Sequence, residues 1–188
     1  MSQVRATDTP ISVIMPVHNA GVYLSAAVQS ILDQRDVQLE LILVDDHSSD
    51  RAISQLPSDE RIKIINLQSL GLEPGIVSAL NAGIDAADYP LIARMDSDDL
   101  SAPNRLRTQL DYYCAHPEVD IVGCAVEIFK DDDAVGDGFN HYQHWLNTQR
   151  RPEQIEQQMF VECCLAHPTF FMTTSLLRSL GGYSDSMA

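Results

Sequence analysis

The sequence predicts an α/β fold in which a mostly parallel sheet carries helices on both faces. Apolar runs of strand length alternate with stretches whose apolar residues recur at helical spacing, and this alternation is typical of βαβ units. Hydrophobic residues make up 45% of the 188 residues and charged residues 21%, which is ordinary for a globular protein with a proper core. We therefore predict one domain over residues 1–188.

Four apolar runs rich in β-branched residues are predicted as the parallel strands. They span residues 11–17, 39–44, 62–65 and 90–93. Helices are expected between and after them, at residues 24–32 with Asn19 as the cap, 50–56, 74–84 and 103–113. The later pattern is weaker: strand within 119–129, a half-helical polar stretch over 141–158, a strand at 168–172 and a short helix before Gly181-Gly182.

Three carboxylates, Asp96, Asp98 and Asp99, follow the fourth predicted strand. Side chains alternate along a strand, so Asp96 and Asp98 are expected on one face and Asp99 on the other. Two acids on one face repel each other unless a cation lies between them. Carboxylate and water ligands suit Mg2+ or Mn2+, shared with a substrate phosphate. A solvated turn is the alternative for an isolated Asp-x-Asp, because Asp and Ser favour turns.

Polar residues also follow the first two strands, at 16–19 and at Asp45-Asp46. Ligands of open α/β sheets bind outside the carboxyl ends of the strands, so these residues and the Asp96 cluster are expected at one edge. The edge is too acidic for a bare anion, which favours a metal-bound nucleotide over a free phosphate ester. An ionised Asp at the end of the second strand can accept hydrogen bonds from a base N–H or a ribose hydroxyl.

Several other classes lack their signatures in this chain. The first predicted strand-to-helix turn has no G-x-G-x-x-G, and no P-loop motif is present. The net charge of -15 argues against a nucleic-acid partner, and no apolar stretch reaches membrane-spanning length. The four cysteines have no metal-ligand spacing, and we interpret them as reduced packing thiols of a cytoplasmic protein: Cys114, Cys124, Cys163 and Cys164.

Seven segments together resemble the family 2 glycosyltransferases, in the right order and over nearly the whole chain. They are Ile11–Asn19, Leu43–Asp50, Leu80–Gly83, Arg94–Asp99, Pro103–Gln109, Ala166–Thr169 and Gly181–Tyr183. The likeness is greatest to bacterial members that build lipopolysaccharide, capsule or exopolysaccharide. It implies a GT-A fold with a Rossmann-like sheet, a nucleotide-sugar donor that is commonly UDP-linked, and inversion at the anomeric carbon. A nucleotide-binding half would span 1–115, and 116–188 would begin an incomplete acceptor-binding half.

The resemblance also implies roles in nucleotide binding. Asp46 would bind the uracil, while Asp45 would support the turn or serve only its own backbone. Asn81 would lie near the nucleotide, and Arg94 would support the carboxylates or the diphosphate, with an ordinary ion pair as the alternative. The base pocket would be lined by Pro16, Val17, His18 and Asn19.

A Mn2+ or Mg2+ ion is the implied cofactor. Asp96 would reach the ribose or the metal, and Asp98 would be the direct metal ligand. His167 would be a second metal ligand; a structural role stays open, because a residue before proline is forced toward extended backbone.

Two departures from the family pattern shape the expected function. His18 stands where many members carry a Tyr that stacks on the base. The general base belongs to an acidic pair after the Gly-Gly-Tyr loop, which puts it beyond Ala188. We therefore expect a glycosyltransferase that moves sugar to a saccharide or a lipid-linked saccharide, in the cytoplasm or at the inner membrane face. The alternatives are a non-catalytic nucleotide-sugar binding module (a pseudoenzyme) and, less favoured, a sugar nucleotidyltransferase.

Overall fold

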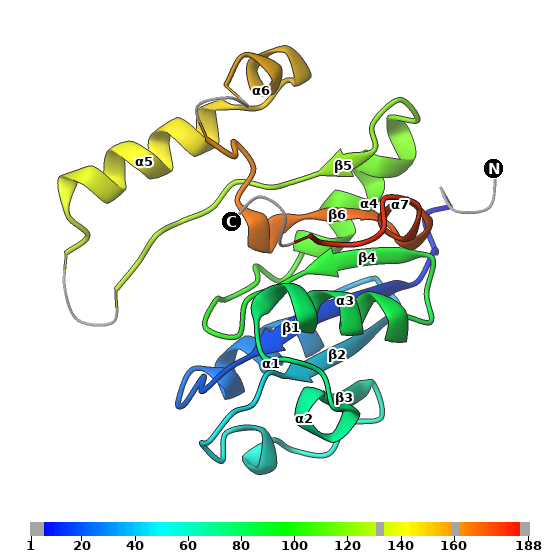
Figure 1. Ribbon diagram of the computed structural model, residues 1–188. Helices are drawn as coiled ribbons and strands as arrows, with labels where there is room; N and C mark the ends of the chain where they lie inside the picture. The colour runs from blue at the N-terminus through cyan, green and yellow to red at the C-terminus, as the bar shows by residue number, and fades with distance from the viewer. Residues whose placement is uncertain (1–5, 131–133, 159–161, 185–188) are drawn as a thin grey trace.

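The structure is a computed structural model that describes residues 6–130, 134–158 and 162–184. Its centre is a six-stranded sheet with the order β3-β2-β1-β4-β6-β5 (Figure 1). The first four strands are parallel, and β6 is antiparallel to both β4 and β5. The strands are β1 (Ile11–Val17), β2 (Leu39–Asp45), β3 (Ile62–Asn66), β4 (Leu91–Arg94), β5 (Ile121–Val122) and β6 (Phe171–Thr173). The predicted α/β class with a mostly parallel sheet is confirmed.

The register of the central strands brings three strand ends to one edge. Val17 at the end of β1 lies opposite Asp45 at the end of β2. Arg94 at the end of β4 lies opposite Ile14, and the chain stays beside β1 because the Met95 N–H donates to the Ile14 carbonyl at 3.0 Å. The residues that follow β1, β2 and β4 therefore meet at the carboxyl edge of the sheet.

Helices cover both faces of the sheet, as predicted. Helices α1 (Leu24–Leu32) and α4 (Arg105–Ala115) pack on one face, and α3 (Ile76–Ala86) and α7 (Thr174–Ser179) pack on the other. Alternate residues of β1 therefore join two separate cores. One core holds Val13 and Met15, and the other holds Ile14. Each fully buried aliphatic side chain contributes about 1.5–3 kcal/mol relative to its exposed state.

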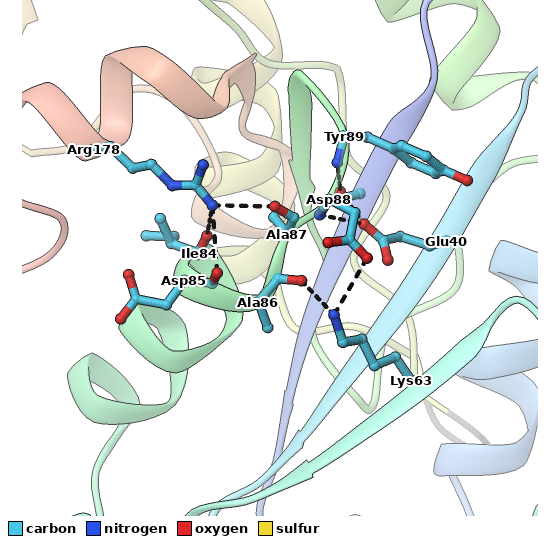
Figure 2. A network of polar contacts seen from close by, with 10 residues as sticks. Glu40, Lys63, Ile84, Asp85, Ala86, Ala87, Asp88, Tyr89 and Arg178 are labelled. Carbon is cyan, nitrogen blue, oxygen red and sulfur yellow. Dashed lines mark hydrogen bonds and ion pairs between the residues drawn. The ribbon is translucent and has the colours of Figure 1, made fainter.

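Helix α3 is fixed along its length and at its carboxyl end. A Cβ at Gly83 would lie 2.4 Å from Ile14 Cγ2, so only glycine permits this approach to β1. Arg178 of α7 donates to the carbonyls of Ile84 (2.9 Å) and Ala87 (3.1 Å), while Lys63 Nζ donates to the Ala86 carbonyl at 2.7 Å (Figure 2). These cations supply donors to carbonyls at the carboxyl end of the helix, where helical N–H partners run out.

Several predicted boundaries were wrong. Tyr23, not Asn19, is the N-cap residue of α1. The second predicted helix is one 3₁₀ turn, Ile53–Gln55, and an unpredicted helix, α2 (Leu67–Leu70), is capped by the Asn66 side chain. The fourth strand ends at Arg94, so Asp96 and Asp98 lie in a turn and strand alternation does not set their directions.

The chain after α4 departs most from the prediction. Among the described residues between α4 and β6, β5 is the only strand, and residues 123–130 form no regular secondary structure. The polar stretch predicted as half helical forms α5 (Asp137–Thr148) and α6 (Pro152–Gln158). A 3₁₀ turn, His167–Thr169, leads into β6.

Two further observations bear on the sequence predictions. Cys124 and Cys163 are exposed, so the packing role predicted for all four cysteines suits only the half-buried Cys114 and the buried Cys164. Among the helices of the described ranges, none combines the length and the apolarity needed to cross a membrane.

Candidate functional site

A crevice of about 320 Å³ opens at the carboxyl edge of the sheet. It brings together six of the predicted site residues, from the ends of three strands, and adds two that were not predicted, Ile76 and Ser97. The lining residues are Pro16, Val17, His18, Asp46, Ile76, Asp96, Ser97 and Asp98. The other predicted residues do not line this crevice: Asn19, Asp45, Asn81, Arg94 and His167.

Asp46 is buried and fixed by three contacts. Its main-chain N–H donates to the Val17 carbonyl at 2.8 Å, and its own carbonyl lies 2.6 Å from His18 Nδ1. Both carboxylate oxygens accept from the Gly75 N–H, at 3.0 and 3.1 Å, at the start of α3. Each carboxylate oxygen has two lone pairs, so Asp46 keeps acceptor capacity for a donor group in the crevice.

Asp45 and Asn19 shape the loops behind the crevice. Asp45 accepts from the Ser48 N–H at 3.0 Å and from Asn66 Nδ2 at 2.7 Å. Asn19 has a left-handed backbone with φ of 51°, and its Oδ1 accepts from the Ser49 N–H at 2.8 Å. Their contacts are to the protein itself, which fits the turn-supporting role predicted for Asp45.

Asp96 is paired with Arg94. Arg94 Nη2 lies 2.6 Å from Asp96 Oδ1, and Nη1 lies 3.3 Å from Oδ2. Arg94 is buried, and its Nε has no hydrogen-bond partner among the described residues. Burial raises the pKa of Asp96 and the charge of Arg94 opposes that rise, while Asp98 adds to it. The ion pair therefore holds the Asp96 carboxylate at the rim of the crevice.

The carboxylates fit a divalent ion that arrives with a phosphate ligand. Asp98 is exposed, and Asp96 and Asp98 line one crevice. Within the described ranges, no group of three or more His, Cys, Asp or Glu could hold a metal by itself. Mg2+ and Mn2+ accept one or two carboxylates when phosphate and water complete the coordination. The residues thus suit a shared ion and do not form a closed protein cage.

His167 and Asn81 lie apart from the crevice. His167 lines a neighbouring cavity of about 830 Å³ with Asp98, and Phe170 and Tyr183 meet its ring edge-on. Burial, and then the charge of Arg94, lower the pKa of His167, so the ring stays neutral and keeps a lone pair for a ligand. Asn81 exchanges two hydrogen bonds with the Tyr183 backbone, at 2.8 and 3.0 Å. Both predicted roles remain predictions.

Sequence reasoning missed two polar residues on the buried face of α4. Arg105 Nη2 donates to the Arg94 carbonyl at 2.7 Å and to the Pro168 carbonyl at 2.9 Å. Gln109 Nε2 donates to the Thr169 carbonyl at 2.7 Å. They join the end of β4 to the His167 turn. Their spacing of four residues on one face with the apolar stripe was the available signal.

The family profile described as "Glycosyl transferase family 2" matches residues 12–181. The chain therefore belongs to glycosyltransferase family 2, and the resemblance inferred from its motifs is confirmed.

Related proteins carry names from the same chemistry. The bifunctional glycosyltransferase pgtA of Dictyostelium discoideum is 32% identical over 180 residues, covering 81% of this chain and 23% of that protein. The O-antigen biosynthesis glycosyltransferase WbnJ of Escherichia coli is 30% identical over 179 residues, covering 92% and 65%. This chain thus spans less than two thirds of each relative.

Two solved structures share the fold. The mannosyltransferase PcManGT from Pyrobaculum calidifontis, in complex with GDP-Man and Mn2+, has a TM-score of 0.69 at 19% identity, covering 97% of this chain and 49% of that one. S. aureus TarS 1-349 in complex with UDP has a TM-score of 0.64 at 18% identity, covering 92% and 49%. At such identities the likeness concerns the fold alone, and the predicted GT-A fold is confirmed.

Proposed function

We propose that this chain binds the nucleotide-sugar donor of an inverting glycosyltransferase and that the donor is UDP-linked. The observation that carries the proposal is the crevice in which His18, Asp46, Asp96 and Asp98 converge at the carboxyl edge of a parallel sheet. In this reading residues 1–115 form the nucleotide-binding half, and 116–188 begin the acceptor-binding half.

Each crevice residue has a chemical task in this proposal. Asp46 accepts from the N–H edge of the base, and His18 contacts the base face. Asp96, oriented by Arg94, reaches the ribose or the ion, and Asp98 ligates the ion. His167 is proposed as a further ligand from the neighbouring cavity. A bound Mn2+ or Mg2+ would offset the negative charge that grows on the leaving diphosphate.

The proposed reaction is a single displacement. An acceptor hydroxyl attacks the anomeric carbon, the bond to the diphosphate breaks, and the nucleoside diphosphate leaves. A carboxylate base takes the hydroxyl proton, a contribution of about 100- to 10,000-fold. The family resemblance assigns that base to an acidic pair after the Gly-Gly-Tyr loop. We propose a saccharide or a lipid-linked saccharide of a cell-surface polysaccharide as acceptor, in line with the O-antigen name of the Escherichia coli relative.

Calorimetric titration of UDP with Mn2+ tests the proposal. Asp98→Asn keeps the size of the side chain and removes its charge, so we expect affinity to fall about tenfold or more, which is about 1.4 kcal/mol per tenfold. Asp85→Asn is the matched control, because Asp85 is exposed near the carboxyl end of α3, away from the crevice. Equal affinity of the wild type and Asp98→Asn would refute the metal role.

A second candidate is a nucleotide-sugar binding module without turnover. Incubation with UDP-sugar and acceptor, followed by product analysis, separates the two readings. A parallel incubation with UTP and sugar phosphate tests for a nucleotidyltransferase.

A further inference from the structure

His18 has a fixed group at each ring nitrogen. Its Nδ1 lies 2.6 Å from the main-chain oxygen of Asp46, and its Nε2 lies 3.1 Å from Asn19 Nδ2. A carbonyl oxygen can only accept a hydrogen bond, so Nδ1 must carry the hydrogen. Asp46 is also anchored through its main-chain N–H, which donates to the Val17 carbonyl at 2.8 Å.

Asn19 determines what the other nitrogen does. Its Oδ1 accepts from the backbone N–H groups of Ser49, at 2.8 Å, and Asp50, at 3.2 Å. Backbone N–H groups can only donate, so turning the amide round would lose both bonds. The Asn19 NH₂ group therefore faces His18 and donates to Nε2, which must be without hydrogen.

These contacts define one protonation form of the ring. We propose that Asn19 and the Asp46 carbonyl lock His18 as the neutral Nδ1–H tautomer, so that the ring already proposed to contact the base face is presented as an uncharged stacking platform. Asn19 is then a positioning residue, because it acts through His18. The inference rests on the proposed function for the identity of the ligand, while the tautomer follows from the protein alone.

The fixed tautomer gives His18 and Asp46 different roles in recognising the base. Both ring nitrogens are committed to the protein, so His18 has only its faces to offer a ligand. His18 is exposed and lines the crevice beside Asp46. The ring therefore supplies stacking, which any base satisfies, and the Asp46 carboxylate supplies the hydrogen-bond acceptor that reads the base edge.

The chain contains its own reference for the tautomer. His47 Nε2 lies 3.0 Å from the Leu72 carbonyl, so in His47 the hydrogen must be on Nε2. His47 is outside the lining of the crevice. The two histidines should therefore show opposite patterns in one spectrum.

Nitrogen NMR of the ¹⁵N-labelled protein shows directly which ring nitrogen of each histidine carries the hydrogen. The measurement is made at about pH 8, where a free imidazole is neutral. We expect Nδ1 of His18 to be protonated and Nε2 bare, with the reverse in His47. Asn19→Asp keeps an oxygen for the Ser49 and Asp50 amides and puts an acceptor opposite Nε2. We expect that variant to lose the bare Nε2 signal. A hydrogen on Nε2 of wild-type His18, or an unchanged pattern in Asn19→Asp, would overturn the lock.

UDP affinity in the presence of Mn2+ tests the platform. We expect His18→Ala to bind about tenfold or more weakly and His18→Phe to stay within about threefold of wild type, since stacking needs only an aromatic face. The control is His47→Asn, because asparagine tolerates the left-handed backbone at that position and the crevice is untouched. His18 is exposed, so unfolding midpoints should be alike across the series.

The outcomes separate this inference from the proposed function. If wild type and His18→Ala bind UDP equally, the platform is wrong and the function stands. If wild-type protein does not bind UDP in the presence of Mn2+, the proposed function fails, and the platform fails with it.

Discussion

The parallel half of the molecule and a second region, helices α5 and α6, are built in different ways. Every residue of β1 is buried. Arg105 and Arg178 donate hydrogen bonds to carbonyls near the carboxyl ends of the neighbouring strand β4 and helix α3. In contrast, α5 has one buried residue, Leu146, and α6 has none. Figure 1 shows α5 and α6 lying away from the sheet. The crevice therefore lies on the part of the chain with the most buried apolar surface.

Polar side chains, rather than a core, connect the second region to its neighbours. Asn147 of α5 accepts from the Val126 N–H at 2.9 Å and donates to the Val126 carbonyl at 2.7 Å. A cavity of about 290 Å³ lies beneath α5 and α6, lined in part by Leu146 and Ile155. With so few buried side chains in α5 and α6, the second region should open more readily than the sheet.

The largest loss of stability is expected when Arg105, in the parallel half, is substituted. Arg105→Met keeps the length of the side chain and a good helix former but removes every donor. The carbonyls of Arg94 and Pro168 would lose a donor from the buried guanidinium. An unsatisfied buried acceptor costs about 1–3 kcal/mol, so we expect a loss of about 3 kcal/mol in the free energy of unfolding, measured by urea denaturation.

The control lies on the same helix. Thr108 is exposed, and surface substitutions away from special contacts change stability little. Thr108→Ala should leave the urea midpoint essentially unchanged. If both variants unfold at the wild-type midpoint, Arg105 does not hold the sheet edge as described.

A smaller effect is expected at Asn81, which ties α3 to the Tyr183 backbone. Asn81→Ala removes both bonds, and we expect a loss of about 1–2 kcal/mol in the free energy of unfolding. Hydrogen exchange at the Tyr183 amide should accelerate by more than the global change accounts for. Ser78→Ala on the same helix is the control. An unchanged exchange rate at Tyr183 would show that the loop is held by something other than Asn81.

The strands β1, β2 and β4 were predictable because they are buried on both faces and so read as continuous apolar runs. The convergence of Asp46, Asp96 and Asp98 was predictable for a related reason, since parallel strands end at a shared edge. Neither inference needs a contact between particular side chains. Periodicity and strand order are enough.

The errors arose where a distant residue decides the local structure. Helix α3 begins at Ile76 and not at Pro74, and Asp46, 29 residues earlier, accepts from Gly75 at its start. The amide of Asn81 pairs with the backbone of Tyr183, 102 residues away, and no local pattern indicated that contact. No window of sequence contains both members of such pairs. The same limit hid Arg105, whose partners come from separate segments.

The smallest change in the free energy of unfolding is expected for a substitution in the second region. Asn147→Ala removes both bonds to Val126, yet α5 buries so little that the free energy of unfolding should change by about 0.5 kcal/mol or less. The Val126 amide should nevertheless exchange clearly faster, because local opening there precedes global unfolding. His144→Ala, at an exposed position of the same helix, should change neither quantity. If Asn147→Ala instead destabilises the whole protein as much as Arg105→Met, the two regions unfold as one cooperative unit and the distinction between them is lost.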